Sequence, residues 1–296
     1  MHATQPDITV VVGARQARGV IAACLSPVIK QLRDVNAEVI VAACPLDSTD
    51  DFVARQFPEV QLIRNGMARL VPELWGLAIP LARAPLVALT TAHCIPDHNW
   101  LASAVSVAAA HPEYAAFGGP IDAPHGGAPA DWALYFARYA AFMPPVSDGP
   151  CTEIAGDNAV YRRAAIDEHW PDRSAGFWET LVHHRLRASG ARLALTPELR
   201  VRSARGAAPW AFAGVRFRHG RHYGTTRPDL GRRARAGRIA AAPLLPLVLL
   251  GRIGQRIARH RPDWRAHYIR SLPWLSLFLG AWSAGEASGY LTGGRS

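Results

Sequence analysis

Polar side chains directly follow a hydrophobic run near residue 90. Leu86–Thr90 is typical of a buried strand, and Thr91-Ala92-His93 comes next in a polar turn, before Pro96 and Trp100. Thr91 and His93 can each offer a hydrogen bond to a phosphate oxygen. His93 can also serve as one ligand of Mn²⁺ or a similar ion, although a lone histidine is more often structural. The turn therefore indicates a phosphate-binding strand end, with or without a metal ion.

A carboxylate stands near the start of a second informative stretch, FWETLVHHRLRASGARL. Its spacing predicts a helix over Phe177–Ser189 that is closed by Gly190. Glu179 at the start of this helix can act as a general base that deprotonates a hydroxyl, a role typically worth about 10² to 10⁴ in rate. The alternative is a solvated glutamate on an amphipathic helix.

Two further turns carry acidic or amide side chains. Asp47 and Asp50 follow the strand predicted over Glu38–Ala43, where they can cap the next helix or contact a ligand. Asp157 and Asn158 lie in the turn GDN, and both are default turn residues as well as candidate ligand contacts. The sequence leaves both choices open.

The elements that position these residues alternate between strand and helix over residues 7–120, and such alternation predicts a mostly parallel sheet with helices on both faces. Ligands of such sheets bind at the carboxyl ends of the strands, so the predicted sites belong to one edge. The expected strands are Ile8–Val12, Glu38–Ala43, Val60–Ile63 and Leu86–Thr90, and the expected helices are Ala17–Val35, Ser48–Phe57, Val71–Ala82 and Trp100–Ala110.

The composition indicates a folded, basic protein. The 296 residues are 49% hydrophobic and 19% charged, and the net charge of +10 suggests an anionic partner. The four cysteines show no CxxC spacing, which argues against a structural zinc site and fits a reducing compartment. No signal peptide is expected from the N-terminus, which leads directly into a strand. Nucleic acid ranks last among the partners, because the basic residues crowd beside apolar runs instead of alternating with exposed aromatics.

The composition shifts after Gly206, and we expect a globular domain over residues 1–228 and a helical appendage over residues 229–296. The apolar run Ile239–Leu250 has 12 residues, whereas a spanning helix needs about 20. With arginines on both sides, this run is typical of a helix that lies on an anionic membrane. Packing against the globular domain is the alternative. A basic cluster precedes the run and consists of Arg216, Arg218, His219 and Arg221, followed by His222.

Four pieces of the chain together resemble a family 2 glycosyltransferase of GT-A fold. They are DITVVVGARQARGVIAACLSPVIKQL, EVIVAAC with Asp47-Ser-Thr-Asp50, VALTTAHCIPDHNWL, and GDNAVYRRAAI followed by FWETLVHHRLRASGARL. Their order and spacing cover about three quarters of the chain. The family's metal-binding Asp-x-Asp is replaced here by Thr91-Ala92-His93, so the chain resembles a variant. WSAGEASGYLTGG is similar to a tail of some membrane-associated members.

The resemblance implies roles for these residues. Glu179 matches the catalytic base, and Asp157 and Asn158 match a turn that faces the sugar or acceptor. The basic cluster would supply the positive charge for the diphosphate. The matching donor-binding positions are Ala14, Arg15, Asp47, Asp50, Thr91 and His93.

The resemblance further implies an inverting transfer from a nucleoside-diphosphate sugar to a hydroxyl or a lipid phosphate. The reaction would take place at the cytoplasmic side of the inner membrane, with a polyprenyl-linked compound as one acceptor. Mg²⁺ or Mn²⁺ could assist through His93, or the transfer could be independent of metal. The competing interpretation is a non-catalytic protein that binds nucleotide sugars, which the missing Asp-x-Asp favours and the presence of Glu179 opposes.

Overall fold

The computed structural model describes residues 5–206, 208–227 and 230–293, which belong to two compact units. Unit 1 comprises Met1–Asp122 and Phe142–Ala204, and unit 2 comprises Ala123–Ala141 and Arg205–Ser296. The division differs from the boundary expected after residue 228. Unit 2 begins earlier and takes in an additional helix from the middle of the chain, because both segments pack with the C-terminal helices.

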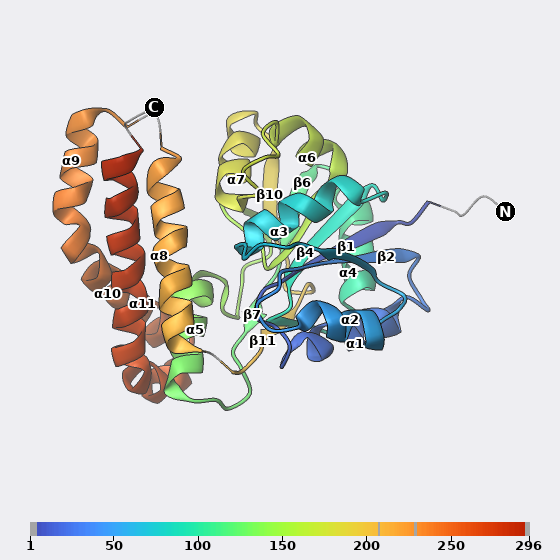
Figure 1. Ribbon diagram of the computed structural model, residues 1–296, viewed down its shortest axis with the longest axis horizontal. Coiled ribbons are helices and arrows are strands. Elements are labelled where there is room, and N and C mark those ends of the chain that lie inside the picture. Colours follow the sequence, from blue (N-terminus) through green and yellow to red (C-terminus); the bar gives the residue numbers. More distant parts are fainter. Residues whose placement is uncertain (1–4, 207, 228–229, 294–296) are drawn as a thin grey trace. The chain divides into compact units, whose positions relative to one another are not determined.

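Unit 1 is built on a mixed, mostly parallel sheet, as expected (Figure 1). β9 runs antiparallel to both of its neighbours and β8 antiparallel to β10, whereas the other pairs are parallel. The strands described in this sheet are, in spatial order, β3 (Gln61–Arg64), β2 (Ala37–Ala43), β1 (Ile8–Ala14), β4 (Leu86–Thr91), β9 (Asn158–Arg162), β6 (Tyr114–Gly118), β10 (Arg192–Leu195) and β8 (Gly149–Cys151). A smaller sheet contains β5 (Cys94–Pro96), β11 (Val201–Ser203) and β7 (Ile121–Asp122).

Helices cover both faces of the large sheet, which explains why β1 and β4 are buried along their whole length. One face carries α1 (Ile21–Gln31), α2 (Thr49–Gln56) and α4 (Trp100–Ala110) (Figure 1). The other carries α3 (Val71–Ala78), α6 (Arg163–His169) and α7 (Glu179–Ala188) (Figure 1). These bounds confirm the expected helices within a few residues, except that α1 begins four residues later and ends four residues earlier than predicted.

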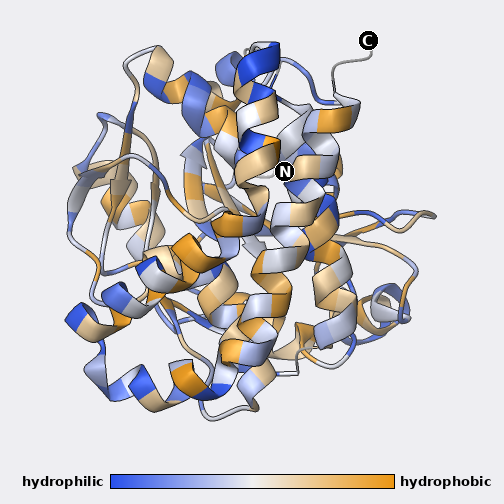
Figure 2. Cartoon of the chain, turned by 90° about the vertical axis from the view of Figure 1, so that its left-hand side faces the viewer, coloured by the Kyte–Doolittle hydropathy of each residue, from blue (hydrophilic) through white to orange (hydrophobic). Residues whose placement is uncertain are grey.

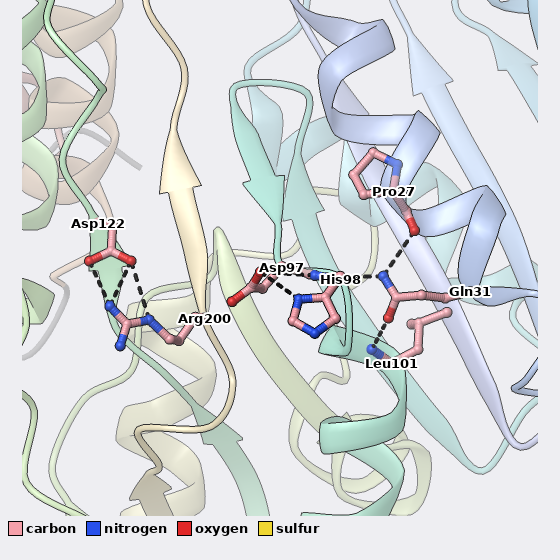
Figure 3. Close-up of polar contacts among 7 residues, drawn as sticks. All are labelled: Pro27, Gln31, Asp97, His98, Leu101, Asp122 and Arg200. Atoms are coloured by element: carbon pink, nitrogen blue, oxygen red, sulfur yellow. Dashed lines mark hydrogen bonds and ion pairs between the residues drawn. The ribbon is translucent and has the colours of Figure 1, made fainter.

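Polar contacts of Gln31 and of Arg200 join neighbouring segments near the β5–α4 turn (Figure 3). Gln31 at the end of α1 donates to the carbonyl oxygens of Pro27 and Asp97 and accepts from the Leu101 backbone N–H. Arg200 forms a forked ion pair with Asp122 beside β7. The Gln of the family-like opening motif thus has a physical role, because it fixes α1 to the turn that leads into α4.

Unit 2 is helical, and hydrophobic and hydrophilic residues alternate along its helices (Figure 2). The longest helix described, α11, packs on α8 and α5 and buries Leu275, Phe278 and Leu279, so it is a core helix of this unit. The helices described in this unit are α5 (Pro129–Tyr139), α8 (Pro209–Thr225), α9 (Arg232–Ala241), α10 (Leu245–His260) and α11 (Arg265–Thr292).

The apolar run Ile239–Leu250 belongs to a helical stretch that is longer than the 12 residues of the run. α9, a short 3-10 turn and α10 form a continuous 29-residue stretch, Arg232–His260. Its length and composition would suffice to cross a membrane, and none of its most apolar window is buried.

Glycines allow α8 and α11 to approach each other closely. A Cβ atom on Gly220 would collide with the backbone carbonyl of Trp282, and one on Gly285 would collide with that of Phe217. Gly224 and Gly289 face the same interface four residues further along their helices. Small residues spaced by four are the usual means of bringing two helix backbones together.

Candidate active site

The carboxyl ends of β1 and β4 come together in unit 1. Gly13 pairs with Thr91 in the sheet, and His93 Nε2 lies 3.2 Å from the backbone carbonyl oxygen of Arg15. The Thr91 hydroxyl accepts a 3.3 Å hydrogen bond from the His93 backbone N–H, and His93 is half-buried. Four of the predicted donor-binding positions, Ala14, Arg15, Thr91 and His93, therefore lie at one edge of the sheet.

Asp47 organises the loop between β1 and α1. Its carboxylate accepts hydrogen bonds from the Arg18 backbone N–H at 2.8 Å and from the Thr49 hydroxyl at 2.5 Å. The Thr49 hydroxyl also accepts from the Ala17 backbone N–H, so residues 15–20 form a tied loop instead of the predicted first helical turn. Asp47 thereby shapes the loop beside Arg15.

Asp50 faces outward from the first turn of α2. It forms an ion pair with Arg64 at 2.7 Å, and Asp51 binds the same guanidinium at 2.8 Å. Ser48 occupies the N-cap position, and no side chain caps this helix by a hydrogen bond. The capping roles considered for Asp47 and Asp50 are therefore replaced by a loop contact and an ion pair.

Glu179 stands at the first position of α7, close to the GDN turn. A Cβ atom on Gly156 would lie 3.2 Å from the Glu179 carboxyl carbon and 3.0 Å from the Trp75 ring. The Trp75 indole N–H donates to the Thr90 carbonyl oxygen at 2.8 Å, and the Thr90 hydroxyl donates to the Asp157 carbonyl oxygen at 2.9 Å. These contacts place the carboxylate near the carboxyl end of β4.

The Asn158 side chain has a structural role in the candidate site. From sequence, Asn158 belongs to a turn that faces the sugar or acceptor, whereas the structure places it fully buried at the start of β9. It accepts from the Trp100 indole N–H at 2.9 Å and donates to the carbonyl oxygens of Leu199 and Pro120. These three bonds use both the oxygen and the nitrogen of the amide, so Asn158 positions the turn. Asp157 beside it is also buried.

Sequence reasoning missed a buried polar network beneath Glu179. His183, one helical turn after Glu179, bonds to the Tyr161 hydroxyl at 2.7 Å and to a Glu153 carboxylate oxygen at 2.9 Å. Burial, and then the charges of Glu179 and Glu153, raise the pKa of Tyr161 well above its usual value. The four-residue spacing of Glu179 and His183 was the available signal, because it places both side chains on one face of the helix.

The residues at this edge do not fit a metal ion held by the protein alone. Among the described residues, no group of three or more His, Cys, Asp or Glu side chains could hold a metal. Thr91-Ala92-His93 supplies a single imidazole and no carboxylate, and the imidazole Nε2 faces the Arg15 carbonyl. Mg²⁺ in particular prefers carboxylate and other oxygen ligands.

The basic cluster lies on α8 and belongs to unit 2, whereas the other predicted site residues belong to unit 1. Arg218 and Arg221 are exposed. The Arg216 guanidinium stacks over the Trp282 ring at 4.3 Å, and burial followed by the charge of Arg138 lowers its pKa to about 9. Burial and the surrounding positive charges also lower the pKa of His219 well below its usual value.

Known structures share this fold. No model of a known protein family matches the chain, and no curated protein matches its sequence. The mannosyltransferase PcManGT of Pyrobaculum calidifontis, in complex with GDP-Man and Mn²⁺, is 19% identical, with a TM-score of 0.55 over 96% of this chain and 88% of that chain. S. aureus TarS 1–349 is 12% identical, with a TM-score of 0.50 over 96% of this chain and 89% of that chain. The likeness shows that the chain has a glycosyltransferase-like α/β fold.

Proposed function

We propose that the protein is an inverting glycosyltransferase, similar to family 2, that moves a sugar from a nucleoside-diphosphate sugar to an acceptor hydroxyl or a lipid phosphate. The observation that carries the proposal is the position of the Glu179 carboxylate beside Gly156, at the carboxyl end of β4. The fold shared with a mannosyltransferase supports it, because open α/β sheets bind their ligands at this edge.

For an acceptor hydroxyl, Glu179 takes the proton as the acceptor oxygen attacks the anomeric carbon of the donor. The bond from that carbon to the diphosphate oxygen breaks, and the nucleoside diphosphate leaves with the electron pair. A carboxylate placed in this way is typically worth about 10² to 10⁴ in rate. An acceptor phosphate is already anionic at neutral pH and needs no such base, so the size of the Glu179 effect distinguishes the two acceptors.

The donor would lie against the β1 and β4 ends. Arg15 stands there, and Asp47 shapes the loop around it. His93 would contact the diphosphate, and the fully buried Thr91 would hold the turn through its hydrogen bond with the His93 backbone N–H. The proposed transfer uses no metal ion held by the chain, and Arg15 at this edge is suited to forked contacts with phosphate. GDP-mannose is the first donor to test, because PcManGT binds GDP-Man.

A location at the cytoplasmic face of a membrane is part of the proposal. The net charge of +10 supports attraction to anionic lipids. The 29-residue stretch Arg232–His260, whose most apolar window is not buried, supplies a segment for membrane contact. Flotation with anionic liposomes tests this part, and unchanged flotation after deletion of the residues beyond Arg232 would contradict it.

The transferase proposal is tested with a panel of nucleotide sugars and two glutamate variants. We expect the correct donor to raise the melting temperature of the wild type and of Glu179→Gln alike. Transfer to a hydroxyl should fall about 10²- to 10⁴-fold in Glu179→Gln and stay unchanged in Glu59→Gln, an exposed carboxylate outside the site. Equal rates in Glu179→Gln and wild type would remove Glu179 as the base.

The second candidate function is a non-catalytic protein that binds nucleotide sugars. The replacement of Asp-x-Asp by Thr91-Ala92-His93 favours it. Stabilisation by a donor without turnover of any donor by the wild type would support this function against the transferase. A failure of every nucleotide and nucleotide sugar to stabilise the protein would reject both.

A further inference from the structure

Unit 2 contains a pocket of about 530 Å³ between α5, α8, α10 and α11. Arginines from three of these helices line it: Arg138 from α5, Arg216 from α8, and Arg252, Arg256 and Arg259 from α10. The residues described in its lining include no Asp or Glu. A pocket with this concentration of positive charge and no carboxylate in its own wall is suited to an anion.

Two of the guanidinium groups have hydrogen-bonding capacity left for a ligand. The Nε atoms of Arg216 and Arg256 are buried, and neither has a hydrogen-bond partner among the described residues. Arg256 is held in place through a second nitrogen, which donates to the Ala141 carbonyl oxygen at 2.6 Å. A buried donor without a partner is costly. An anion with several oxygens in this pocket could accept hydrogen bonds from both Nε atoms.

Arg138 and Arg216 also repel each other. Burial, and then the neighbouring charge of Arg138, lower the pKa of Arg216 to about 9, because both disfavour the charged form of the guanidinium. The Trp282 ring, 4.3 Å from the Arg216 guanidinium, offsets part of this cost as a cation–π contact. A bound phosphate would remove more of it, because Arg and phosphate form strong, forked hydrogen bonds.

The remainder of the wall is apolar. Phe136, Leu249, Ile253, Leu279 and Trp282 supply hydrocarbon or aromatic surface to the same pocket. α10 is part of the stretch Arg232–His260, on which Leu244 and Leu247 are more than 60% exposed. The ligand that matches both parts of the wall carries a phosphate on an apolar chain.

We propose that this pocket binds the phosphate head of a lipid, with Arg138 and Arg216 on the phosphate and the apolar wall against the first part of the chain. The inference concerns unit 2 alone and does not depend on the proposed transfer reaction. The lipid could be a phosphomonoester, such as a lipid-phosphate acceptor, or an anionic membrane phospholipid, and the two share the chemistry that the pocket recognises.

Calorimetric titration of the full-length protein with short-chain lipids below their micelle concentration tests the proposal. The probes are dihexanoyl phosphatidic acid, dihexanoyl phosphatidylglycerol, dihexanoyl phosphatidylcholine and inorganic phosphate. We expect phosphatidic acid to bind at least about tenfold more tightly than phosphatidylcholine or inorganic phosphate, because only the acid satisfies both parts of the wall. If phosphatidylglycerol binds as tightly as phosphatidic acid, the pocket is a phospholipid site. If phosphatidylglycerol binds more weakly, the pocket is a phosphomonoester site.

Three variants complete the experiment. Arg216→Gln should weaken the binding of phosphatidic acid about tenfold or more. Arg252→Gln, at an exposed position of the pocket wall, should act in the same direction and serves if Arg216→Gln does not fold. Arg265→Gln, an exposed arginine outside the pocket, should leave affinity within about twofold. Equal affinity for phosphatidic acid and phosphatidylcholine, or equal losses in all three variants, would overturn the proposal.

Discussion

The hydroxyl of Tyr161 on β9 lies 2.7 Å from Nε2 of His183 on α7, and both side chains are fully buried. His183 Nδ1 lies 2.9 Å from a carboxylate oxygen of Glu153. Because a carboxylate only accepts, a neutral His183 carries its proton on Nδ1 and accepts at Nε2 the hydrogen bond that Tyr161 donates. This pair fixes α7, which begins with Glu179, against the sheet.

Tyr161→Phe removes one half of this pair. The substitution leaves His183 Nε2 buried without its donor, so we expect the free energy of unfolding to fall by about 1 to 3 kcal/mol. Urea unfolding should show a lower midpoint at an unchanged slope. Tyr114→Phe removes a hydroxyl from a half-buried ring on β6 and should change stability by less than about 0.5 kcal/mol. Similar losses in both variants would argue against a special role for the pair.

Gly156→Ala should lower activity more than stability. The added methyl group would stand 3.0 Å from the Trp75 ring and 3.2 Å from the Glu179 carboxyl carbon, and the flexible Glu179 side chain can shift more readily than the Trp75 ring. A displacement of about 1 Å can cost about 10²-fold in rate. Steady-state kinetics with the donor identified by thermal shift measure the effect. Gly66→Ala, where nothing lies within 4 Å of the added methyl group, should retain full activity.

Gly285→Ala should separate α8 from α11. A Cβ atom there would overlap the backbone carbonyl of Phe217, and a backbone cannot move aside as a flexible side chain can. We expect a loss of about 1 to 3 kcal/mol, the usual cost of overpacking. Gly280→Ala on the same helix meets nothing within 4 Å and should be neutral or slightly stabilising. Thermal unfolding of the two variants gives the comparison, and equal melting temperatures would contradict the close packing.

Glu38 should contribute to stability in a pH-dependent way. Its burial raises the pKa, but hydrogen bonds from the Thr9 hydroxyl and from the backbone and guanidinium of Arg83 outweigh burial and lower the pKa below 4.5. The contribution is therefore complete above the unfolded pKa and is lost as pH falls through the lower folded value. Glu38→Gln should destabilise the protein at pH 7, and its difference from wild type should narrow toward pH 3 in urea unfolding. A difference that is constant with pH would contradict this assignment.

Chelation should leave the reaction intact. Thr91-Ala92-His93 provides no carboxylate for a metal ion, and His93 Nε2 faces the Arg15 carbonyl. We expect transfer in excess EDTA to stay within about twofold of the untreated rate, since the diphosphate charge is met by arginine and by hydrogen bonds. Loss of activity in EDTA with recovery in Mn²⁺ would show instead that the donor diphosphate completes a metal site.

The alternation of strands and helices was sufficient to predict the layered sheet and the edge at which the candidate site lies. Buried strands stand out as short, continuous runs of apolar and β-branched residues, and such runs can be recognised from consecutive residues along β1 and β4. The same local reading identified the strand end at Thr91 and the carboxylate of Glu179, because both stand at element boundaries. Both observations need only a few consecutive residues.

The contacts of the polar side chains depend on the folded chain and could not be predicted from local sequence. Asn158 bonds to residues 38 to 58 positions away in the chain, and Asp47 shapes a loop 29 positions away. The role of the glycines of α8 and α11 follows only from the close packing of the two helices. The half-buried Arg216 stacks its guanidinium over the Trp282 ring through that packing. Such pairings depend on chain closure over long separations, which no local period encodes.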